Sequence, residues 1–260
     1  MQIPVIVMGA AGRMGSTMCR LVREFDDLQL AGAVERPGQL DRLAGLPCAV
    51  SSDVTELMAK VPGAVLIDFT APSASLATAR AAAGAGCAHV IGTTGFSVGE
   101  REELEALAKD TPLFWSPNMS IGVNVLLQVL PLLTQLLGEA YDIDMMEIHH
   151  NKKKDSPSGT ALRLAEAVAE SRGVELEDVA CYCRHGIIGE RPQGELGIQA
   201  IRGGDVVGVH TVYFMGPGER IELTHQAHSR ENFANGALRA VRWLHGREAG
   251  RLYSMRDILG

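Results

Sequence analysis

The sequence predicts an α/β protein with two domains: a parallel sheet covered by helices, then a mixed α/β domain whose sheet is largely antiparallel. Three observations support this prediction. Short apolar runs alternate with helical patterns in the first half of the chain, which is typical of parallel sheets. After about residue 118, several strand-like segments follow one another without a helix between them. The length of 260 residues accommodates one large domain or two modest ones, at about 100–200 residues each.

The predicted elements of the first half begin with a strand, a glycine-rich turn and a helix. The strand covers Ile3–Met8, and the helix extends to about Phe25. Four further apolar runs predict strands, and two segments rich in helix-forming residues predict helices between them. These strands are Leu28–Val34, Ala64–Phe69, Ala88–Ile91 and Leu113–Trp115, and the helices are Ser73–Ala85 and Val98–Lys109.

The second half is predicted to contain three helices and five strands. The helices are Ile121–Leu137, Ala161–Arg172 and Asn232–Leu244. The strands are Ile143–Ile148, Val179–Cys183, Leu196–Ile201, Val206–Phe214 and Arg220–His225. Gly216-Pro217-Gly218 predicts a tight turn that joins the last two strands in a hairpin.

Composition and charge argue against several classes of protein. The net charge of −7 argues against nucleic-acid binding, and the short basic run Lys152-Lys153-Lys154 does not change this. We find no run of about 18 uncharged apolar residues and no basic leader, which predicts neither a membrane span nor a signal peptide. Five scattered cysteines indicate reduced thiols in a cytoplasmic protein. No metal site is predicted, because Cys181 and Cys183 lack further ligands at suitable spacing.

A candidate phosphate-binding turn, Gly9-Ala-Ala-Gly12-Arg-Met-Gly15, follows the first strand and opens the first helix. Its small residues let the backbone approach a pyrophosphate, and the helix N-terminus offers N–H groups to the phosphates. The turn departs from the strict G-x-G-x-x-G pattern, since Ala10 stands where the first glycine would fall. An ordinary tight turn is the alternative interpretation.

The ends of the later strands strengthen the dinucleotide interpretation. Glu35 stands 20 residues after Gly15, where a carboxylate hydrogen-bonds the adenosine ribose in NAD-binding folds. Arg36 follows at once, and its guanidinium could instead accept a 2′-phosphate. Small and hydroxyl residues that could line the nicotinamide follow two further strands, in Asp68-Phe69-Thr70-Ala71-Pro72 and Gly92-Thr93-Thr94-Gly95. A solvated Glu-Arg pair and plain turn residues are the alternatives.

The densest group of reactive side chains is Glu147-Ile-His149-His150-Asn-Lys-Lys153-Lys-Asp155-Ser-Pro-Ser158-Gly159-Thr160-Ala161, between a predicted strand and a predicted helix. The N–H groups and hydroxyls of its Ser-Gly-Thr turn could form a seat for a carboxylate. Lysine and histidine supply positive charge and transferable protons. A metal site is not favoured, because adjacent histidines on a strand face opposite ways and no third ligand is evident. A solvated basic turn before a capped helix is the alternative.

Seven segments together resemble the dihydrodipicolinate reductases, also described as 4-hydroxy-tetrahydrodipicolinate reductases. The segments are GAAGRMG, DFTAPSAS, GTTGFS, SPNMSIGVNV, EIHHNKKKDSPSGTA, GGDVVGVHTV and FANGALRAVRWL. The resemblance extends from Val5 to Leu259. It implies NAD(P)H-dependent reduction of 4-hydroxy-tetrahydrodipicolinate to tetrahydrodipicolinate in lysine and diaminopimelate biosynthesis. A two-domain dehydrogenase of an amino acid or semialdehyde and a non-catalytic nucleotide sensor are the alternatives.

The resemblance also implies a domain organisation. A Rossmann-type, dinucleotide-binding domain would comprise residues 1–119, completed by residues 230–260. Residues 120–229 would form a domain for substrate binding and oligomerisation in a homotetramer. Val209 departs from the family pattern, in which an acidic residue is common at this position.

Roles for individual residues follow from the same resemblance. It places the acid/base histidine at His149 and the proton-donating lysine at Lys153. The substrate, a small dicarboxylate, would contact His150, Ser158, Gly159 and Thr160. The dinucleotide, NADH or NADPH, would contact Gly9, Ala10, Ala11, Gly12, Arg13, Met14, Glu35, Arg36, Gly92, Thr93, Thr94, Ser116, Pro117, Asn118 and Met119.

Overall fold

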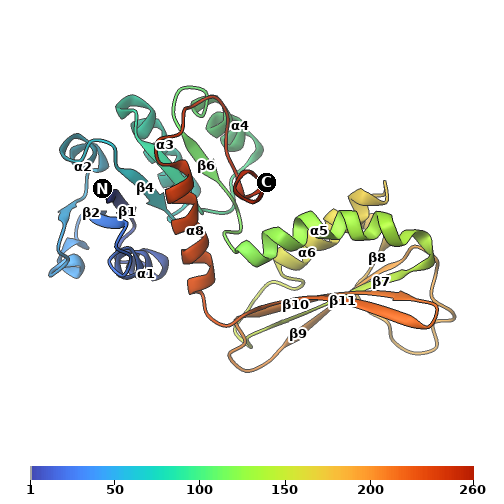
Figure 1. Ribbon diagram of the computed structural model, residues 1–260. Helices are drawn as coiled ribbons and strands as arrows, with labels where there is room; N and C mark the ends of the chain where they lie inside the picture. Colours follow the sequence, from blue (N-terminus) through green and yellow to red (C-terminus); the bar gives the residue numbers. More distant parts are fainter. Residues whose placement is uncertain (1) are drawn as a thin grey trace. The chain divides into compact units, whose positions relative to one another are not determined.

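The structure is a computed structural model that describes residues 2–260. Within these residues the chain forms two compact units. The first comprises the described residues up to Ser120 together with Phe233–Gly260, and the second comprises Ile121–Asn232. Figure 1 labels the elements of both units.

Within the described residues, the first unit is built on a six-stranded parallel sheet in the order β3-β2-β1-β4-β5-β6. Its strands are β1 (Ile3–Met8), β2 (Leu28–Val34), β3 (Ala49–Ser51), β4 (Val65–Asp68), β5 (Ala88–Ile91) and β6 (Leu113–Trp115). The strand order reverses at β1, and ligands of such sheets bind beyond the carboxyl ends of the strands at this point. The predicted Rossmann-type sheet is confirmed.

Four α-helices in the described part of the first unit connect strands of this sheet, and two more come after its last strand in the chain. They are α1 (Arg13–Val22), α2 (Val54–Lys60), α3 (Pro72–Ala85), α4 (Val98–Leu107), α8 (Glu231–Leu244), which begins in the last residues of the second unit, and α9 (Met255–Leu259). A proline at the first turn of α3 and a capping box of Ser97 and Glu100 on α4 define where these helices begin. Sequence patterns missed β3 and α2, because neither is long enough to show a clear periodicity.

The second unit, all of it described, carries a five-stranded sheet in the order β11-β10-β7-β9-β8. Its strands are β7 (Asp142–His149), β8 (Ala180–Cys181), β9 (Leu196–Arg202), β10 (Gly208–Gly216) and β11 (Glu219–Ala227). The pairings of β10 with β7 and β11 are antiparallel, as predicted, but β9 pairs parallel with β7 and with β8. The sheet is therefore mixed. The parallel pairing arises because the chain returns from β7 through helices before it reaches β9.

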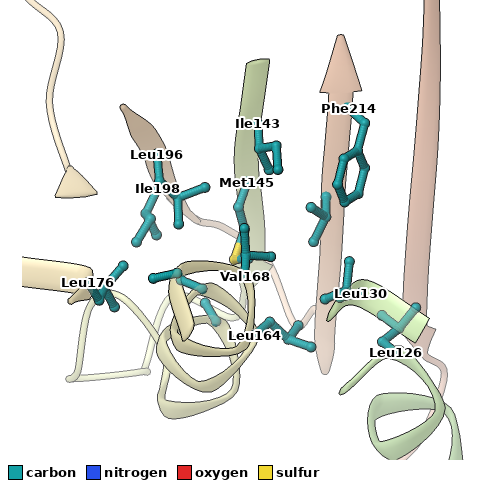
Figure 2. Packing of buried hydrophobic residues seen from close by; sticks show 14 residues of the cluster. Leu126, Leu130, Ile143, Met145, Leu164, Val168, Leu176, Leu196, Ile198 and Phe214 are labelled. Atoms are coloured by element: carbon teal, nitrogen blue, oxygen red, sulfur yellow. The ribbon is translucent and has the colours of Figure 1, made fainter. Parts of the chain in front are cut away.

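Helices α5 (Ile121–Leu137) and α6 (Gly159–Ser171) cover one face of this sheet, and α7 (Leu176–Val179) leads into β8. Figure 2 shows their apolar side chains packed against the strands. The buried cluster includes Leu126 and Leu130 of α5, Leu164 and Val168 of α6, and residues of β7, β9 and β10 such as Met145, Ile198 and Phe214. This core fixes the end of β7 relative to the start of α6.

Helix α5 bears on the expectation that the chain has no membrane span. The segment Ile121–Ala140 is long and apolar enough to cross a membrane, judged by length and composition alone. Leu126 and Leu130 of the same helix are buried in the core of the second unit. A core helix of a globular domain passes the same test, so the segment is weak evidence for a membrane span.

Candidate active site

The reactive cluster lies at the end of β7 and the start of α6. Side chains alternate between the two faces of a strand, so Glu147 and His149 share the buried face of β7 with Met145. His150 follows the strand, and its N–H donates a hydrogen bond to the Val206 carbonyl. The core beneath β7 and α6 therefore holds this polar segment in a fixed position.

Glu147 sets the protonation of His149. The Nδ1 atom of His149 lies 2.6 Å from Glu147 Oε2. Burial raises the pKa of Glu147, but hydrogen bonds from Arg202, His149 and the Ser158 N–H outweigh it and hold this pKa below its ordinary value. Because the carboxylate is ionised, Nδ1 of His149 carries the proton and donates the bond.

Its lowered pKa makes His149 a neutral imidazole near pH 7, with Nε2 unprotonated. Burial lowers the pKa of His149, although Glu147 opposes this effect. A Cβ atom at Gly208 of β10 would lie 3.0 Å from Nε2, so glycine keeps this nitrogen uncrowded. Two residues along β10, the His210 ring packs edge-on at 5.1 Å between centroids, and burial lowers the pKa of His210 to about 4.

Lys153 differs from its two lysine neighbours. Its side chain is 20% exposed and its Nζ lies 2.8 Å from Asp155 Oδ2, whereas Lys152 and Lys154 are exposed. Its N–H donates a hydrogen bond to the His150 carbonyl, which ties the lysine to the turn that follows β7. One ammonium of the three is therefore held by Asp155, on the turn that follows the two histidines.

The residues expected to form a carboxylate seat lie in the first turn of α6. Ser158 is the N-cap of this helix, and its buried Oγ accepts a hydrogen bond from Ala161 N–H and lies 3.1 Å from His210 Nε2. Its hydroxyl is therefore engaged within the fold. Among the described residues nothing lies within 4 Å of the Cβ that Gly159 lacks, so the space above this turn is open. A helix N-terminus with open space above it suits a carboxylate.

The glycine-rich turn of the first unit borders a cavity of about 590 Å³. Gly9 has a φ of +60°, a conformation that favours glycine. The Gly12 N–H donates a hydrogen bond to the Gly9 carbonyl at 2.9 Å. The expected cofactor residues that line this cavity are Gly9, Gly12, Arg13, Met14, Glu35 and Arg36, together with Phe69 and Thr70 from the end of β4.

Glu35 makes hydrogen bonds within the fold that its position in the motif does not predict. Its Oε2 accepts a hydrogen bond from Ala11 N–H at 3.0 Å, and its Oε1 accepts one from Arg36 N–H at 2.9 Å. The carboxylate thus braces the glycine-rich turn, with only 9% of its side chain exposed, whereas the Arg36 side chain is 84% exposed. Arg36 is the more accessible of the two to an incoming phosphate.

The remaining expected cofactor residues lie elsewhere. Gly92 approaches the Phe69 ring so closely that any side chain there would overlap it, and Thr93 Oγ1 lies 2.7 Å from Ser75 Oγ. The set Gly92, Thr93 and Thr94 follows β5, and the set Ser116, Pro117, Asn118 and Met119 follows β6. Both sets lie at the carboxyl edge of the sheet. Ala10 and Ala11 line a different cavity, of about 420 Å³.

Within residues 2–260 the five cysteines are free thiols, and no group of three His, Cys, Asp or Glu side chains is arranged to hold a metal ion.

Sequence reasoning missed Arg202, Gly208 and His210. They lie on β9 and β10, far along the chain from His149, and only the pairing of these strands with β7 brings them to it. Of the three, only His210 carries a signal in the sequence, as a histidine within an apolar strand.

Comparison with known proteins finds matches over nearly the whole length of the chain. Family models described as the N-terminus and the C-terminus of dihydrodipicolinate reductase match residues 3–119 and 122–259. A 4-hydroxy-tetrahydrodipicolinate reductase of Nitratidesulfovibrio vulgaris (strain DP4) is 64% identical over 258 residues, covering 99% of this chain and 100% of its own. One from Lawsonia intracellularis (strain PHE/MN1-00) is 53% identical over 259 residues, covering 100% of both chains.

A solved structure shares the fold of the chain. It is the dipicolinate-bound dihydrodipicolinate reductase from Paenisporosarcina sp. TG-14, with a TM-score of 0.80, 23% identity and coverage of 98% of both chains.

Proposed function

The chain belongs to the dihydrodipicolinate reductase family, and we propose that His149, Lys153 and the first turn of α6 carry out the family's reaction here. That reaction is the NAD(P)H-dependent reduction of 4-hydroxy-tetrahydrodipicolinate to tetrahydrodipicolinate, in lysine and diaminopimelate biosynthesis. The family favours it over the alternative of an amino-acid or semialdehyde dehydrogenase. The observation that supports these residues is that a neutral histidine, a held ammonium and an open helix N-terminus follow one another on one ordered segment.

Substrate binding follows from the charges of this segment. The substrate is a ring with two carboxylates, which favour charged donors and helix N-termini. We assign one carboxylate to the N–H groups of Gly159 and Thr160. His150 and Lys153 provide further donors on the same segment. Ser158 supports the seat as its N-cap.

We assign the proton transfers of the reaction to Lys153 and His149. Bound NADH or NADPH would supply a hydride to ring C4 of the substrate. The ring then carries enamine-like negative charge and must gain a proton at the neighbouring carbon. The Lys153 ammonium stabilises this charge and delivers the proton. Before hydride transfer the 4-hydroxy substrate loses water, and His149 Nε2 can accept the proton from the ring carbon beside C4 and pass it to the departing hydroxide.

The cofactor would bind in the first unit, which we assign as the dinucleotide-binding domain, and the substrate in the second. The cavity of about 590 Å³ is bordered by the glycine-rich turn and by the first residues of α1, and the N–H groups at a helix N-terminus suit a pyrophosphate. Glu35 braces the turn and Arg36 extends beside it. We propose that both NADH and NADPH bind.

Replacing Arg36 by alanine should weaken NADPH binding about tenfold and leave NADH binding nearly unchanged, because only NADPH carries a 2′-phosphate for the guanidinium. Fluorescence titration of each cofactor measures both affinities. The exposed Arg101 of α4 provides the control, and Arg101→Ala should affect neither. Equal losses for NADH and NADPH in Arg36→Ala would refute this assignment.

We also propose that the protein is a cytoplasmic homotetramer assembled through the second unit. Helix α5 exposes apolar side chains at helical spacing, and such surfaces often mark protein interfaces. They are Val125, Val129, Leu132 and Leu136, between 37% and 74% exposed. Free thiols suit a reducing compartment. Light scattering on the purified protein measures the mass of the assembly, and a monomer would contradict the proposal.

The function is tested by following NAD(P)H oxidation while dihydrodipicolinate synthase generates the substrate in the same cuvette. We expect oxidation that depends on both the synthase and this protein. If substrate-dependent oxidation occurs with neither NADH nor NADPH, the proposed function is overturned.

Pyridine-2,6-dicarboxylate should inhibit competitively against the substrate. It presents two carboxylates to the same donors, and its planar aromatic ring does not readily accept hydride. Pyridine-2-carboxylate, with a single carboxylate, is the matched control and should bind more weakly. Calorimetry with NADH present measures both ligands, and the carboxylate seat is wrongly assigned if the dicarboxylate fails to bind even at millimolar concentration.

A further inference from the structure

We propose that the buried ion pair of Glu147 and Arg202 positions the active site: it fixes the tautomer of His149 and holds the carboxylate seat and the Lys153 turn in place. Both residues act through others, so they are positioning residues rather than catalytic ones. The inference rests on the proposed function of His149 and Lys153, and it is independent of which cofactor is used.

The pair is a two-pronged contact between neighbouring strands. Arg202 Nη1 lies 2.7 Å from Glu147 Oε2, and Nη2 lies 2.7 Å from Oε1. The Glu147 side chain is completely buried, and that of Arg202 is 21% exposed. In the parallel register of β7 and β9, Arg202 stands beside His149. This fork-to-fork geometry restricts both side chains in orientation as well as distance.

Each carboxylate oxygen of Glu147 accepts a second donor from the site. Oε2 accepts the Nδ1 proton of His149 at 2.6 Å, and Oε1 accepts the N–H of Ser158, the N-cap of α6, at 2.9 Å. Arg202 Nη2 also donates to the Asp155 carbonyl at 2.8 Å, within the turn that carries Lys153. One ion pair therefore contacts the imidazole, the carboxylate seat and the lysine turn.

The charge of Arg202 matters for the state of His149. A buried carboxylate alone beside an imidazole would favour the doubly protonated ring, whose Nε2 could no longer accept a proton. The guanidinium offsets this attraction while leaving Glu147 as an acceptor. His149 then keeps Nδ1 protonated and directs an unprotonated Nε2 toward the space beside Gly208.

Glu147→Gln removes this arrangement with little change in shape. Four donors converge on the two carboxylate oxygens: one from His149, one from Ser158 and two from Arg202. A glutamine offers a single oxygen, and its NH₂ group must face two of these donors. We therefore expect the His149 ring to lose its fixed tautomer.

The test is long-range ¹H–¹⁵N NMR of protein labelled at histidine, with the His149 signals assigned from a His149→Gln sample. We expect the Nδ1–H tautomer in the wild type and the Nε2–H form or a mixture in Glu147→Gln. In the reductase assay kcat should fall about 10- to 100-fold, less than for full loss of acid–base catalysis. The KM for NADH should be unchanged.

Asp144→Asn is the matched control. Asp144 lies on the same strand and pairs with Arg184, with Nη2 of Arg184 3.0 Å from Asp144 Oδ1, and its side chain is also largely buried. This variant should lose stability comparably, yet retain the wild-type tautomer and kcat. If Glu147→Gln fails to fold, Arg202→Lys takes its place in the test. This variant keeps the charge but loses the two-pronged contact, and it should retain only part of the wild-type kcat.

An unchanged tautomer in Glu147→Gln, or an equal loss of kcat in Asp144→Asn, would overturn the positioning role. So would an Arg202→Lys variant with wild-type kcat, if Glu147→Gln does not fold. The tautomer is measured without substrate. A wild type that shows no reductase activity would therefore refute the proposed function, while the NMR comparison would still decide the role of Glu147.

Discussion

Replacement of Lys153 by methionine is expected to lower kcat by about 10²–10⁴-fold, the usual range for losing general acid catalysis. Methionine keeps most of the length of the side chain but removes the charge and the transferable proton. Negative charge develops on the substrate ring only after hydride arrives, so the ammonium stabilises the transition state more than the bound substrate. An interaction of that kind lowers kcat when it is removed, whereas a uniform contact mainly raises KM. Steady-state kinetics separates the two effects.

The neighbouring lysines are built-in controls for this prediction. Lys152 and Lys154 are exposed, whereas Lys153 is largely buried and paired with Asp155. Lys152→Met and Lys154→Met should therefore change kcat little. NADH affinity should remain unchanged in all three variants, because the proposed dinucleotide site lies in the first unit. The assignment fails if Lys152→Met or Lys154→Met lowers kcat more than Lys153→Met does. It also fails if Lys153→Met alters KM alone.

Local sequence predicted most of the fold, because turn residues delimit most elements. The predicted bounds of β1, β2, β5, β6 and α5 match the structure. The parallel pairing of β9 with β7 was not predictable in the same way. This pairing depends on where the chain returns to the sheet after α6 and α7. The residues of β9 alone do not indicate which strand β9 will pair with.

The same distinction between local and distant information applies to the candidate site. His149, Lys153 and the start of α6 form one continuous segment, so their residue types alone indicated acid–base chemistry and carboxylate binding. Arg202 reaches this segment only through strand pairing. Glu35 shows a further limit of motifs: its position in the sequence suggested a ribose contact, whereas in the fold one oxygen accepts the N–H of Ala11 in the glycine-rich turn and the other accepts the N–H of Arg36.

Gly15→Ala should weaken NADH and NADPH binding alike, by about 10- to 100-fold, and should lower stability by about 1–3 kcal/mol. A Cβ at this position in α1 would overlap the Gly9 carbonyl and lie 2.7 Å from Ala10 Cα. These backbone atoms have little freedom to move, because Ala10 N–H donates to the Val34 carbonyl at 3.0 Å. Helix α1 would have to shift away from the turn, and its first N–H groups would no longer point at the pyrophosphate.

Gly84→Ala in α3 separates this effect from a general intolerance of added methyl groups. Among the described residues nothing lies within 4 Å of the added Cβ at position 84, and its backbone is helical. Alanine is a better helix former than glycine, so this variant should gain about 0.5–1 kcal/mol and bind both cofactors normally. Thermal unfolding and fluorescence titration measure the two variants side by side. If Gly15→Ala bound NADH with wild-type affinity, the phosphates would have to lie away from this turn, because the clash cannot be relieved while α1 keeps its present position.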